Sequence, residues 1–306
     1  MTTAGFDLVG IGEGMVEFHA SGAFASAQTF HRGFAGDVVN SLIHASRMGL
    51  RTALVSRIGD DAFAPALVAE WTAEAVDLTH ASVVPGENGL YFILTDAKGE
   101  REFLYRRAGS AASRIGPGDI DPALLGAARF VLVSGITQAI SATAEAAVAA
   151  ACAIDGARAN TVYDPNYRPR LWAQRGGEVA AQGAFASIAA KVAWIMPSFP
   201  ADLQLVGAGP LDARAALAAF AAVSGANVAL KLGEHGVLLH VRGQVTHVPA
   251  VPAPMIVDTT GAGDAWNAAF LHGLACEQVP EQAAAAANLY AVGILGCRGA
   301  IPPRLP

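Results

Sequence analysis

The chain has 306 residues, of which 53% are hydrophobic and 15% are charged, and its formal net charge is -6. This length allows a sizeable core, and an acidic balance without a basic run argues against nucleic acid or an anionic membrane as a partner. Three separated cysteines without a CxxC argue against a disulfide framework, and the start MTTAGFDLVGIGEGM has no signal-peptide pattern, so we expect a cytoplasmic protein.

Short β-branched runs alternate with alanine-rich helical patterns along the chain. This alternation predicts an α/β fold with a mostly parallel sheet and helices on both faces. Asp37 and Asp61 are expected helix N-caps, and Gly49 an expected C-cap. Strands are expected at 6–12, 51–59, 129–135, 160–166, 192–198 and 227–233, and helices at 37–49, 61–76, 143–154 and 212–223.

The segment 89–107 departs from this rhythm. It reads GLYFILTDAKGEREFLYRR, two extended runs around a polar turn, which predicts a hairpin rather than a strand–helix–strand unit. Ligands of open α/β sheets bind beyond the carboxyl ends of the strands, so a small sheet there could act as a lid. We expect a single domain, 1–306, with a lid formed by about 13–35 and 87–108. The exposed face of the hairpin is expected to carry Tyr91, Tyr105, Arg106 and Arg107.

Several common nucleotide and hydrolase motifs are missing. None of the three lysines follows a glycine, so there is no Walker A loop. Trp266 stands where a dinucleotide fingerprint would have its third glycine, and the early GxGxG is followed by no helix pattern. Neither GxSxG nor HExxH occurs. These absences argue against nicotinamide enzymes, serine hydrolases and zincins.

The stretch DTTGAGDAWNAAF, residues 258–270, carries the main chemical signal. A helix that begins near Gly261 would point the amides of Gly261, Ala262 and Gly263 at one spot, which suits a phosphate. Asp264, one step on, could take the proton of a hydroxyl aligned with that phosphate. For GAGD alone, a glycine turn capped by aspartate is the simpler interpretation, because short glycine motifs recur by chance.

Longer strings resemble a known family. DTTGAGDAWNAAFL resembles the C-terminal signature of the ribokinase-like (PfkB-type) sugar kinases, RGFAGDVVNSLIHASRMG their N-terminal glycine segment, and KLGEHGV their nucleotide loop. Within that family, GLYFILTDAKGEREFLYRR, VLVSGITQAI, YDPNYRPRLW and RGAIPPR resemble the kinases of 2-keto-3-deoxygluconate. The resemblance implies a ribokinase-like core with a β-lid and transfer of phosphate from ATP to the sugar acid's terminal hydroxyl. Alternatives are a fructokinase or related keto-sugar-acid kinase, and a non-catalytic sugar-acid binder.

The resemblance also implies a substrate site. Asp264 becomes the general base, and Gly36 and Asp37 contact substrate hydroxyls, with Ala35 where relatives carry glycine. Asp258 falls in the sugar-facing region, although a capping role is an alternative. A keto acid needs a cation for its carboxylate, for which arginine is best suited. The candidates are Arg107 and Arg168, while Tyr91 and Tyr105 either pack over the sugar or form flap core.

For ATP, the resemblance implies Asn166, Ser198, Gly263, Asn288 and the loop with Lys231, Gly233 and Gly236. That loop could instead be an ordinary turn between strands. Mg2+ is an expected cofactor, and a monovalent cation is left open. The metal ligands stay unassigned, because Ala201 stands where relatives have a glutamate and Asp202 follows one place late. A homodimer through the lid is expected from the family.

Overall fold

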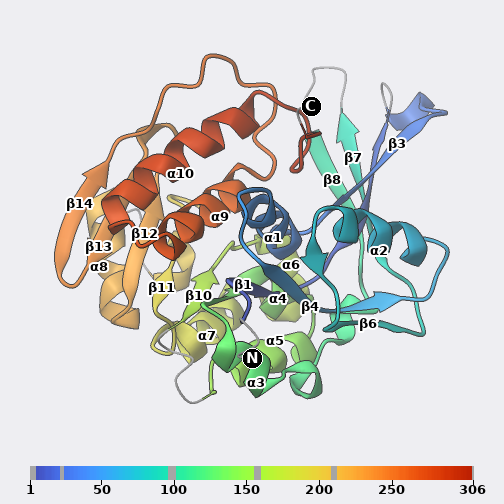
Figure 1. The fold of residues 1–306 in the computed structure, drawn as a ribbon, viewed down its shortest axis with the longest axis horizontal. Helices are drawn as coiled ribbons and strands as arrows, with labels where there is room; N and C mark the ends of the chain where they lie inside the picture. Colours follow the sequence, from blue (N-terminus) through green and yellow to red (C-terminus); the bar gives the residue numbers. More distant parts are fainter. Residues whose placement is uncertain (1–4, 21–23, 96–100, 155–159, 208–211, 305–306) are drawn as a thin grey trace.

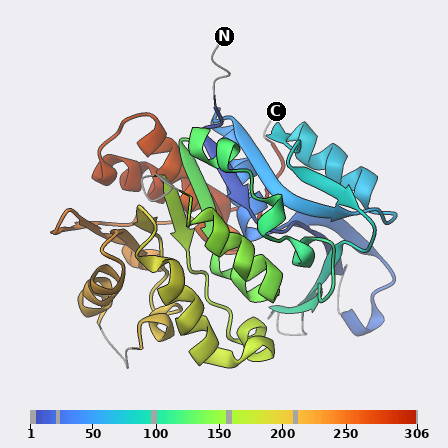
Figure 2. The same ribbon diagram turned by 90° about the horizontal axis from the view of Figure 1, so that it is seen from below.

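The computed structural model describes residues 5–20, 24–95, 101–154, 160–207 and 212–304. Its centre is a ten-stranded sheet in the order β14-β13-β12-β11-β10-β9-β1-β4-β5, with β6 paired to β4 (Figures 1 and 2). Pairing is parallel from β5 to β12 and antiparallel between β12, β13 and β14. The strands are β1 (Leu8–Ile11), β4 (Thr52–Gly59), β5 (Val76–Asp77), β6 (Ala81–Val84), β9 (Phe130–Ser134), β10 (Thr161–Asp164), β11 (Trp194–Ile195), β12 (Asn227–Lys231), β13 (Val237–Val241) and β14 (Gln244–Val248).

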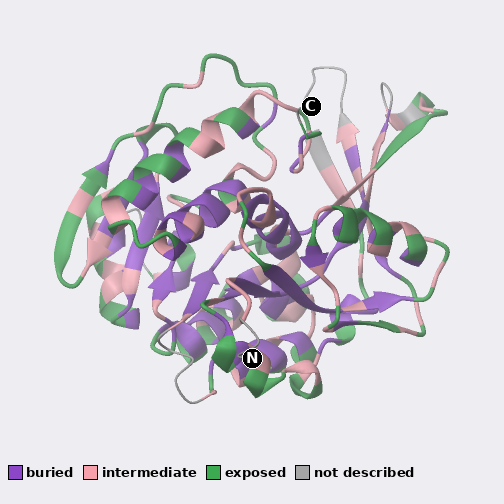
Figure 3. Ribbon diagram, in the orientation of Figure 1, coloured by how far each residue is buried: buried purple, intermediate pink, exposed green. Residues whose placement is uncertain are grey.

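Helices cover both faces of this sheet, as predicted. Consecutive residues of one strand enter opposite cores, because side chains alternate across a strand: Val131 and Val133 join one core and Leu132 the other. The first core is closed by α3 (Pro122–Ala127), α4 (Gly135–Ile140), α5 (Ala142–Ala151), α6 (Pro169–Trp172), α7 (Gly177–Ala189) and α8 (Ala213–Ser224). The second is closed by α1 (Asp37–Arg47), α2 (Ala64–Ala73), α9 (Ala262–Ala275) and α10 (Pro280–Leu295). Buried positions dominate the central strands (Figure 3).

A second, four-stranded sheet stands apart from the large one, in the order β3-β2-β7-β8. It contains β2 (Met15–Ala20), β3 (Phe30–Ala35), β7 (Gly89–Thr95) and β8 (Arg101–Arg106). The antiparallel pair of β7 and β8 confirms the predicted hairpin, whose turn at 96–100 lies outside the described residues. One face packs Met15, Tyr91 and Ile93 against Ala300 of the C-terminal segment.

The predicted caps need correction. Asp37 is the first residue of α1 rather than its N-cap, which is Gly36, so the Asp37 side chain is available to the site. Asp61 precedes the Phe63 N-cap of α2 and accepts a hydrogen bond from the Phe63 amide at 2.9 Å. Gly49 follows the C-cap of α1 and ends the helix with a φ of 97°. Among the described helices, none is long and apolar enough to cross a membrane.

Candidate active site

The mouth of α9 requires a glycine at its N-cap. Gly261 has a φ of 76°, a left-handed conformation that side chains disfavour. A Cβ atom at this position would also come within 2.6 Å of the Cβ atom of Ala300. The helix start and the C-terminal segment therefore meet at a point where only glycine fits.

Two of the three predicted phosphate donors are available. The Ala262 amide donates to the Thr259 carbonyl at 3.3 Å, which corrects the expectation of three free amides. Within the described part of the chain, the amides of Gly261 and Gly263 meet no acceptor. Gly263 is exposed, so an anion can reach its backbone.

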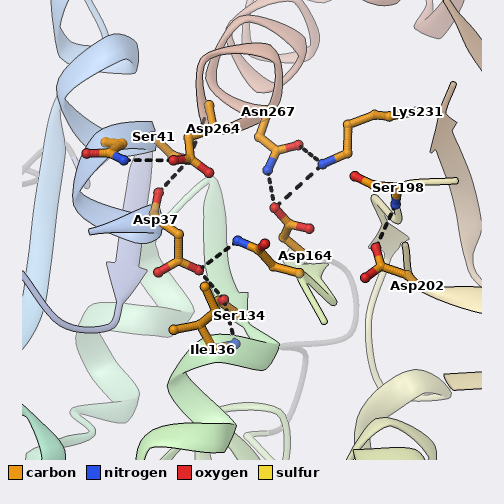
Figure 4. A network of polar contacts seen from close by, with 12 residues as sticks. Asp37, Ser41, Ser134, Ile136, Asp164, Ser198, Asp202, Lys231, Asp264 and Asn267 are labelled. Carbon is orange, nitrogen blue, oxygen red and sulfur yellow. Dashed lines mark hydrogen bonds and ion pairs between the residues drawn. The ribbon is translucent and has the colours of Figure 1, made fainter. Parts of the chain in front are cut away.

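Asp264 lies in the first turn of α9 and faces α1. Its Oδ2 accepts a hydrogen bond from Asn40 Nδ2 at 2.7 Å, and its main-chain oxygen accepts one from Ser41 Oγ at 3.1 Å (Figure 4). Burial and then the nearby Asp37 raise the pKa of the Asp264 carboxyl well above its usual value, while Asn40 and Lys231 oppose the rise. A carboxylate with a raised pKa is a stronger base than an ordinary aspartate.

Asp37 lies opposite Asp264 and is held by the last residue of β9 and by the segment that follows β10. Its Oδ2 accepts hydrogen bonds from Ser134 Oγ and, at 3.3 Å, from Asn166 Nδ2. Burial raises the pKa of Asp37, and the Ser134 hydrogen bond partly counteracts it. Asn166 therefore directs its side chain to the predicted sugar contact rather than to the nucleotide loop. Two acceptor-rich carboxylates suit a ligand rich in hydroxyl groups.

A lysine, an amide and a third acid form the other half of the site (Figure 4). Lys231 Nζ donates to Asn267 Oδ1 at 2.9 Å and lies 3.5 Å from Asp164 Oδ2. Asn267 Nδ2 donates to the same Asp164 oxygen at 2.6 Å. Among described residues, the other oxygen of Asp164, Oδ1, is buried without a hydrogen-bond partner. It is thus free to accept from a ligand.

The main chain places Ser198 beside Lys231, as their common assignment to ATP requires. The Lys231 amide donates to Pro197 at 2.8 Å, and the Phe199 amide donates to the Lys231 carbonyl at 2.8 Å. Asp202 fastens this segment: its carboxylate accepts from the amides of Ser198 at 2.6 Å and Tyr167 at 2.7 Å.

Asp202 is 1% exposed, and burial followed by the charge of Asp164 raises its pKa to about 6. Because both of its oxygens accept main-chain amides, it connects two loops.

The remaining residues assigned to ATP have structural duties. Asn288 accepts from Trp266 Nε1 at 2.8 Å and donates to the Pro249 carbonyl at 2.9 Å, so its amide holds protein segments together. Gly233 and Gly236 have φ values of 60° and 88° and shape the tight turn between β12 and β13.

Arg107 is not on an exposed face, contrary to the prediction. Its side chain is 10% exposed and forms an ion pair with Glu13, which is 1% exposed. Its guanidinium also lies 5.3 Å from the ring centre of Tyr105. Burial raises the pKa of Glu13, and the Arg107 charge opposes that rise. Part of the arginine's charge is therefore already compensated within the protein.

The two tyrosines of the hairpin differ, although their rings stack 5.7 Å apart. Tyr91 is 4% exposed and its hydroxyl donates to Glu17, so its predicted exposure is wrong. Tyr105 is 44% exposed. Arg168, just after β10, is exposed as well and donates to the Tyr167 carbonyl at 3.3 Å. Tyr105 and Arg168 are thus the accessible members of the predicted substrate set.

Asp258 fastens the C-terminal segment. Oδ1 accepts from the Thr260 amide at 2.9 Å and from Thr260 Oγ1 at 2.7 Å, while Oδ2 accepts from the Gly299 amide at 2.8 Å. These bonds favour the capping alternative over sugar contact.

At the end of β3, Ala35 is buried, and a Cβ atom at Gly36 would lie 2.2 Å from the Glu13 carbonyl oxygen.

Residues 7–306 match the model of the pfkB family of carbohydrate kinases. The chain belongs to this family. It is 33% identical over 308 residues to the 2-dehydro-3-deoxygluconokinase of Dickeya dadantii, with 96% of both chains covered. It is 31% identical to the enzyme of the same name from Thermoproteus tenax, with 96% of this chain and 91% of that one covered. These matches confirm that the sequence of this kinase resembles PfkB-type sugar kinases.

Solved structures confirm the ribokinase-like fold. The PfkB protein from Polaromonas sp. JS666 superposes with a TM-score of 0.84 at 27% identity, over 94% of each chain. A putative ribokinase II from E. coli, in complex with ATP and Mg2+, gives a TM-score of 0.84 over 96% of this chain and 94% of that one. At 23% identity, the second similarity shows the fold alone.

The carboxylates of the site suit a Mg2+ ion that is bound mainly through the phosphate oxygens of the nucleotide. No cluster of three or more His, Cys, Asp or Glu side chains that could hold a metal occurs in the described segments. Mg2+ is commonly bound through one or two carboxylates, phosphate oxygens and water. The unpartnered Asp164 Oδ1 offers one such oxygen.

The sequence prediction missed the residues that hold the chemical groups in place. Asn267 follows Asp264 by three positions and so shares its side of α9, a spacing that could have revealed it. Asp164 lies in YDPNYRPRLW, one of the segments that resemble the family. Asn40 and Ser134 carried no local signal, because they reach the site only through tertiary contacts.

Proposed function

We propose that this sugar kinase phosphorylates 2-keto-3-deoxy-D-gluconate at O6 and releases 2-keto-3-deoxy-6-phosphogluconate and ADP. The observation that carries the proposal is the juxtaposition of Asp264 with the two free amides of Gly261 and Gly263. The similarity to two curated 2-dehydro-3-deoxygluconokinases over nearly the whole chain supports the choice of substrate.

Asp264 is the general base. The substrate hydroxyl lies between Asp264 and the phosphate, and its proton passes to the carboxylate as its oxygen attacks phosphorus. Asn40 fixes the carboxylate and helps keep it ionised. The amides of Gly261 and Gly263, at the positive end of α9, stabilise charge on the transferred group.

Mg2+, when bound with ATP, neutralises phosphate charge. Asp164 would hold the ion through its unpartnered oxygen, while its other oxygen accepts the hydrogen bond from Asn267. Ser198 and the turn after Lys231 contact the nucleotide. Asp202 and Asn288 act indirectly, by holding the segments around it.

The substrate carboxylate is held by arginine. Arg168 is exposed beside the site, whereas Arg107 is buried and shared with Glu13. We assign direct carboxylate binding chiefly to Arg168 and a supporting role to Arg107. Tyr105 packs on the sugar acid, and the ring of Tyr91 stacks on the ring of Tyr105 and supports it.

The small sheet is proposed to serve as both lid and dimer surface. One face carries the stacked pair of Tyr91 and Tyr105, and the other carries an aromatic cluster in which Phe30 is 37% exposed. Light scattering coupled to size exclusion tests the dimer. Phe30→Glu should convert a dimer to a monomer, and a monomeric wild-type protein would contradict this assignment.

A coupled ADP-release assay across a panel of sugars and sugar acids tests the proposed reaction. The panel contains 2-keto-3-deoxygluconate, its galactonate epimer, gluconate, fructose and ribose. The highest kcat/KM is expected for a 2-keto-3-deoxy acid, with the phosphate on O6 by NMR. A fructose preference would favour the alternative, since a fructokinase of Klebsiella pneumoniae is 29% identical over 82% of this chain and 80% of that one. No turnover on any acceptor would favour a binder.

A further inference from the structure

Lys231 brings a cation into a site that is otherwise crowded with acids. The residue is 9% exposed and lies at the end of β12. Its ammonium group has three donors. One donates to Asn267 Oδ1 at 2.9 Å, and Asp164 Oδ2 lies 3.5 Å away. This cation is therefore not a solvated surface charge.

The ammonium group faces the mouth of α9. A Cβ atom placed on Gly263 would lie 4.0 Å from Lys231 Nζ. Gly263 also bears one of the two free amides, and the positive charge of Lys231 lowers the pKa of Asp264. The cation therefore lies close to the free amide of Gly263, and the Asp264 base follows that glycine directly in the first turn of α9.

Both the main chain and the side chain of Lys231 are fixed. The main chain is bonded to Pro197 and Phe199, each at 2.8 Å. Asn267 is 1% exposed and uses its oxygen for Lys231 and its nitrogen for Asp164. A buried cation with this support is preorganised, and preorganised charge is what electrostatic catalysis requires.

We propose that Lys231 is a catalytic residue that contacts the phosphoryl group in flight, and that Asn267 is its positioning residue. The proposal deepens the proposed kinase function and is independent of which sugar acid is used. The substrate oxygen forms a bond to the γ-phosphorus as the bond to the bridging oxygen of ADP breaks and its electron pair leaves with ADP. The hydroxyl proton goes to Asp264, while Lys231 keeps its protons and stabilises the negative oxygens.

Lys231→Met tests this role, with Lys191→Met as control. Methionine keeps the length and apolar stem of the side chain but removes the charge, and Lys191 is an exposed lysine just after α7. We expect kcat to fall about 10²-fold to 10³-fold, as for loss of one oxyanion-type donor, while KM for ATP changes only a few-fold. The control should match the wild-type protein. An unchanged kcat with a greatly raised KM for ATP would make Lys231 a ground-state nucleotide ligand and overturn the proposal.

Binding of a transition-state analogue gives a second readout without turnover. Calorimetry compares Mg-ADP alone with Mg-ADP plus aluminium fluoride, each with saturating 2-keto-3-deoxygluconate. Lys231→Met should keep ADP affinity within a few-fold and lose about 10²-fold in affinity for the analogue, because catalytic contacts are stronger in the transition state. Equal losses for both would overturn the proposal.

Asn267→Ala serves as the second variant in case Lys231→Met does not fold. It keeps the lysine but frees its ammonium group, so kcat and analogue affinity should fall together, by about 10-fold, with ADP affinity retained. If the wild-type protein releases no ADP with any acceptor, the proposed function itself fails. If it is active and both variants bind the analogue normally, only the role of Lys231 fails.

Discussion

The mouth of α9 and the small sheet present two different ways of building a ligand site. At the mouth, each chemical group is held by a partner from a distant part of the chain: Asp264 by Asn40, Asp37 by Ser134, and Lys231 by Asn267. At the small sheet, Tyr105 and the neighbouring Arg168 are exposed.

From this difference we expect the mouth of α9 to serve catalysis and the sheet side to serve recognition. Removing charged groups from water is costly unless they are well paired, so the crowded acids at the mouth need the surrounding hydrogen bonds. Exposed groups keep their hydration until a ligand replaces it. Substitutions at the mouth should therefore lower kcat, and substitutions at the sheet side should mainly change which substrate is used.

Asp264→Asn should have the largest effect. Asparagine keeps the shape but cannot accept the proton, so kcat should fall about 10²-fold to 10⁴-fold, the usual worth of a general base. The sugar-acid dissociation constant should change little in calorimetry. Glu277→Gln, at an exposed acid after α9, is the control. Turnover at the wild-type rate in Asp264→Asn would contradict the general-base role of Asp264. It would also contradict the assignment of catalysis to the mouth of α9.

Arg168→Ala tests recognition. Loss of a charge-assisted hydrogen bond is worth about 1.5–3 kcal/mol, so KM for 2-keto-3-deoxygluconate should rise roughly 10-fold to 100-fold. Catalysis on fructose, at whatever low level it occurs, should hardly change. Arg170→Ala, at an exposed neighbour, is the control. Equal losses for the acid and for fructose would contradict a carboxylate contact.

Arg107→Ala should behave differently, because it leaves Glu13 buried without its counterion. Breaking a buried pair costs about 3–5 kcal/mol, so the free energy of unfolding should fall by a similar amount in urea titrations. Arg107→Ala combined with Glu13→Gln should recover much of that loss. No recovery would show that the packing of Arg107 matters more than its charge.

The sequence predicted most of the fold and the main chemical groups at the mouth of α9. The strands, the hairpin and the start of α9 follow from local pattern, because alternation, alanine-rich periodicity and glycine at a helix start each have a local physical cause. Asp264 and Gly263 were found for the same reason. Their roles in catalysis stay predictions.

What the sequence missed depends on tertiary contacts. Tyr91 and Tyr105 occupy equivalent positions on paired strands, yet only Tyr91 is buried, since the C-terminal segment packs beside it. The sequence left Asp258 between a sugar contact and a capping role, and the hydrogen bond from Gly299, 41 residues away, favours the second. The pairing of Arg107 with Glu13 joins two loops that are even more remote in sequence.

Asn40→Ala gives a smaller effect and reports on the electrostatics of the mouth. The Asn40 hydrogen bond lowers the pKa of Asp264, so its loss should raise that pKa further. A base must be ionised to act, and the acid limb of the kcat profile should therefore move to higher pH while the plateau changes little. Ser41→Ala is the matched control, because Ser41 bonds the main-chain oxygen of Asp264 and not the carboxylate. Equal shifts in both variants would contradict the assignment of this limb to Asp264.

Asp202→Asn should alter stability more than catalysis, since both carboxylate oxygens of Asp202 accept main-chain amides from two loops. Burial raises the pKa of Asp202 from 3.8 to about 6, so the folded protein binds its proton more tightly than the unfolded chain does. The contribution of this group to stability is therefore fully present below about pH 4 and is lost as pH rises through 6.

At about 1.4 kcal/mol per pKa unit, this loss amounts to about 3 kcal/mol. Asparagine cannot titrate, so the stability of the wild-type protein relative to Asp202→Asn should decline by that order between pH 4 and 7 in urea titrations. Glu277→Gln, at an exposed acid, should show no such trend. A difference that stayed constant with pH would mean that Asp202 is ionised throughout, held so by the amides of Ser198 and Tyr167. In that case an ionised carboxylate would hold the two loops through charge-assisted hydrogen bonds, as Asp264 and Asp37 are held at the mouth of α9.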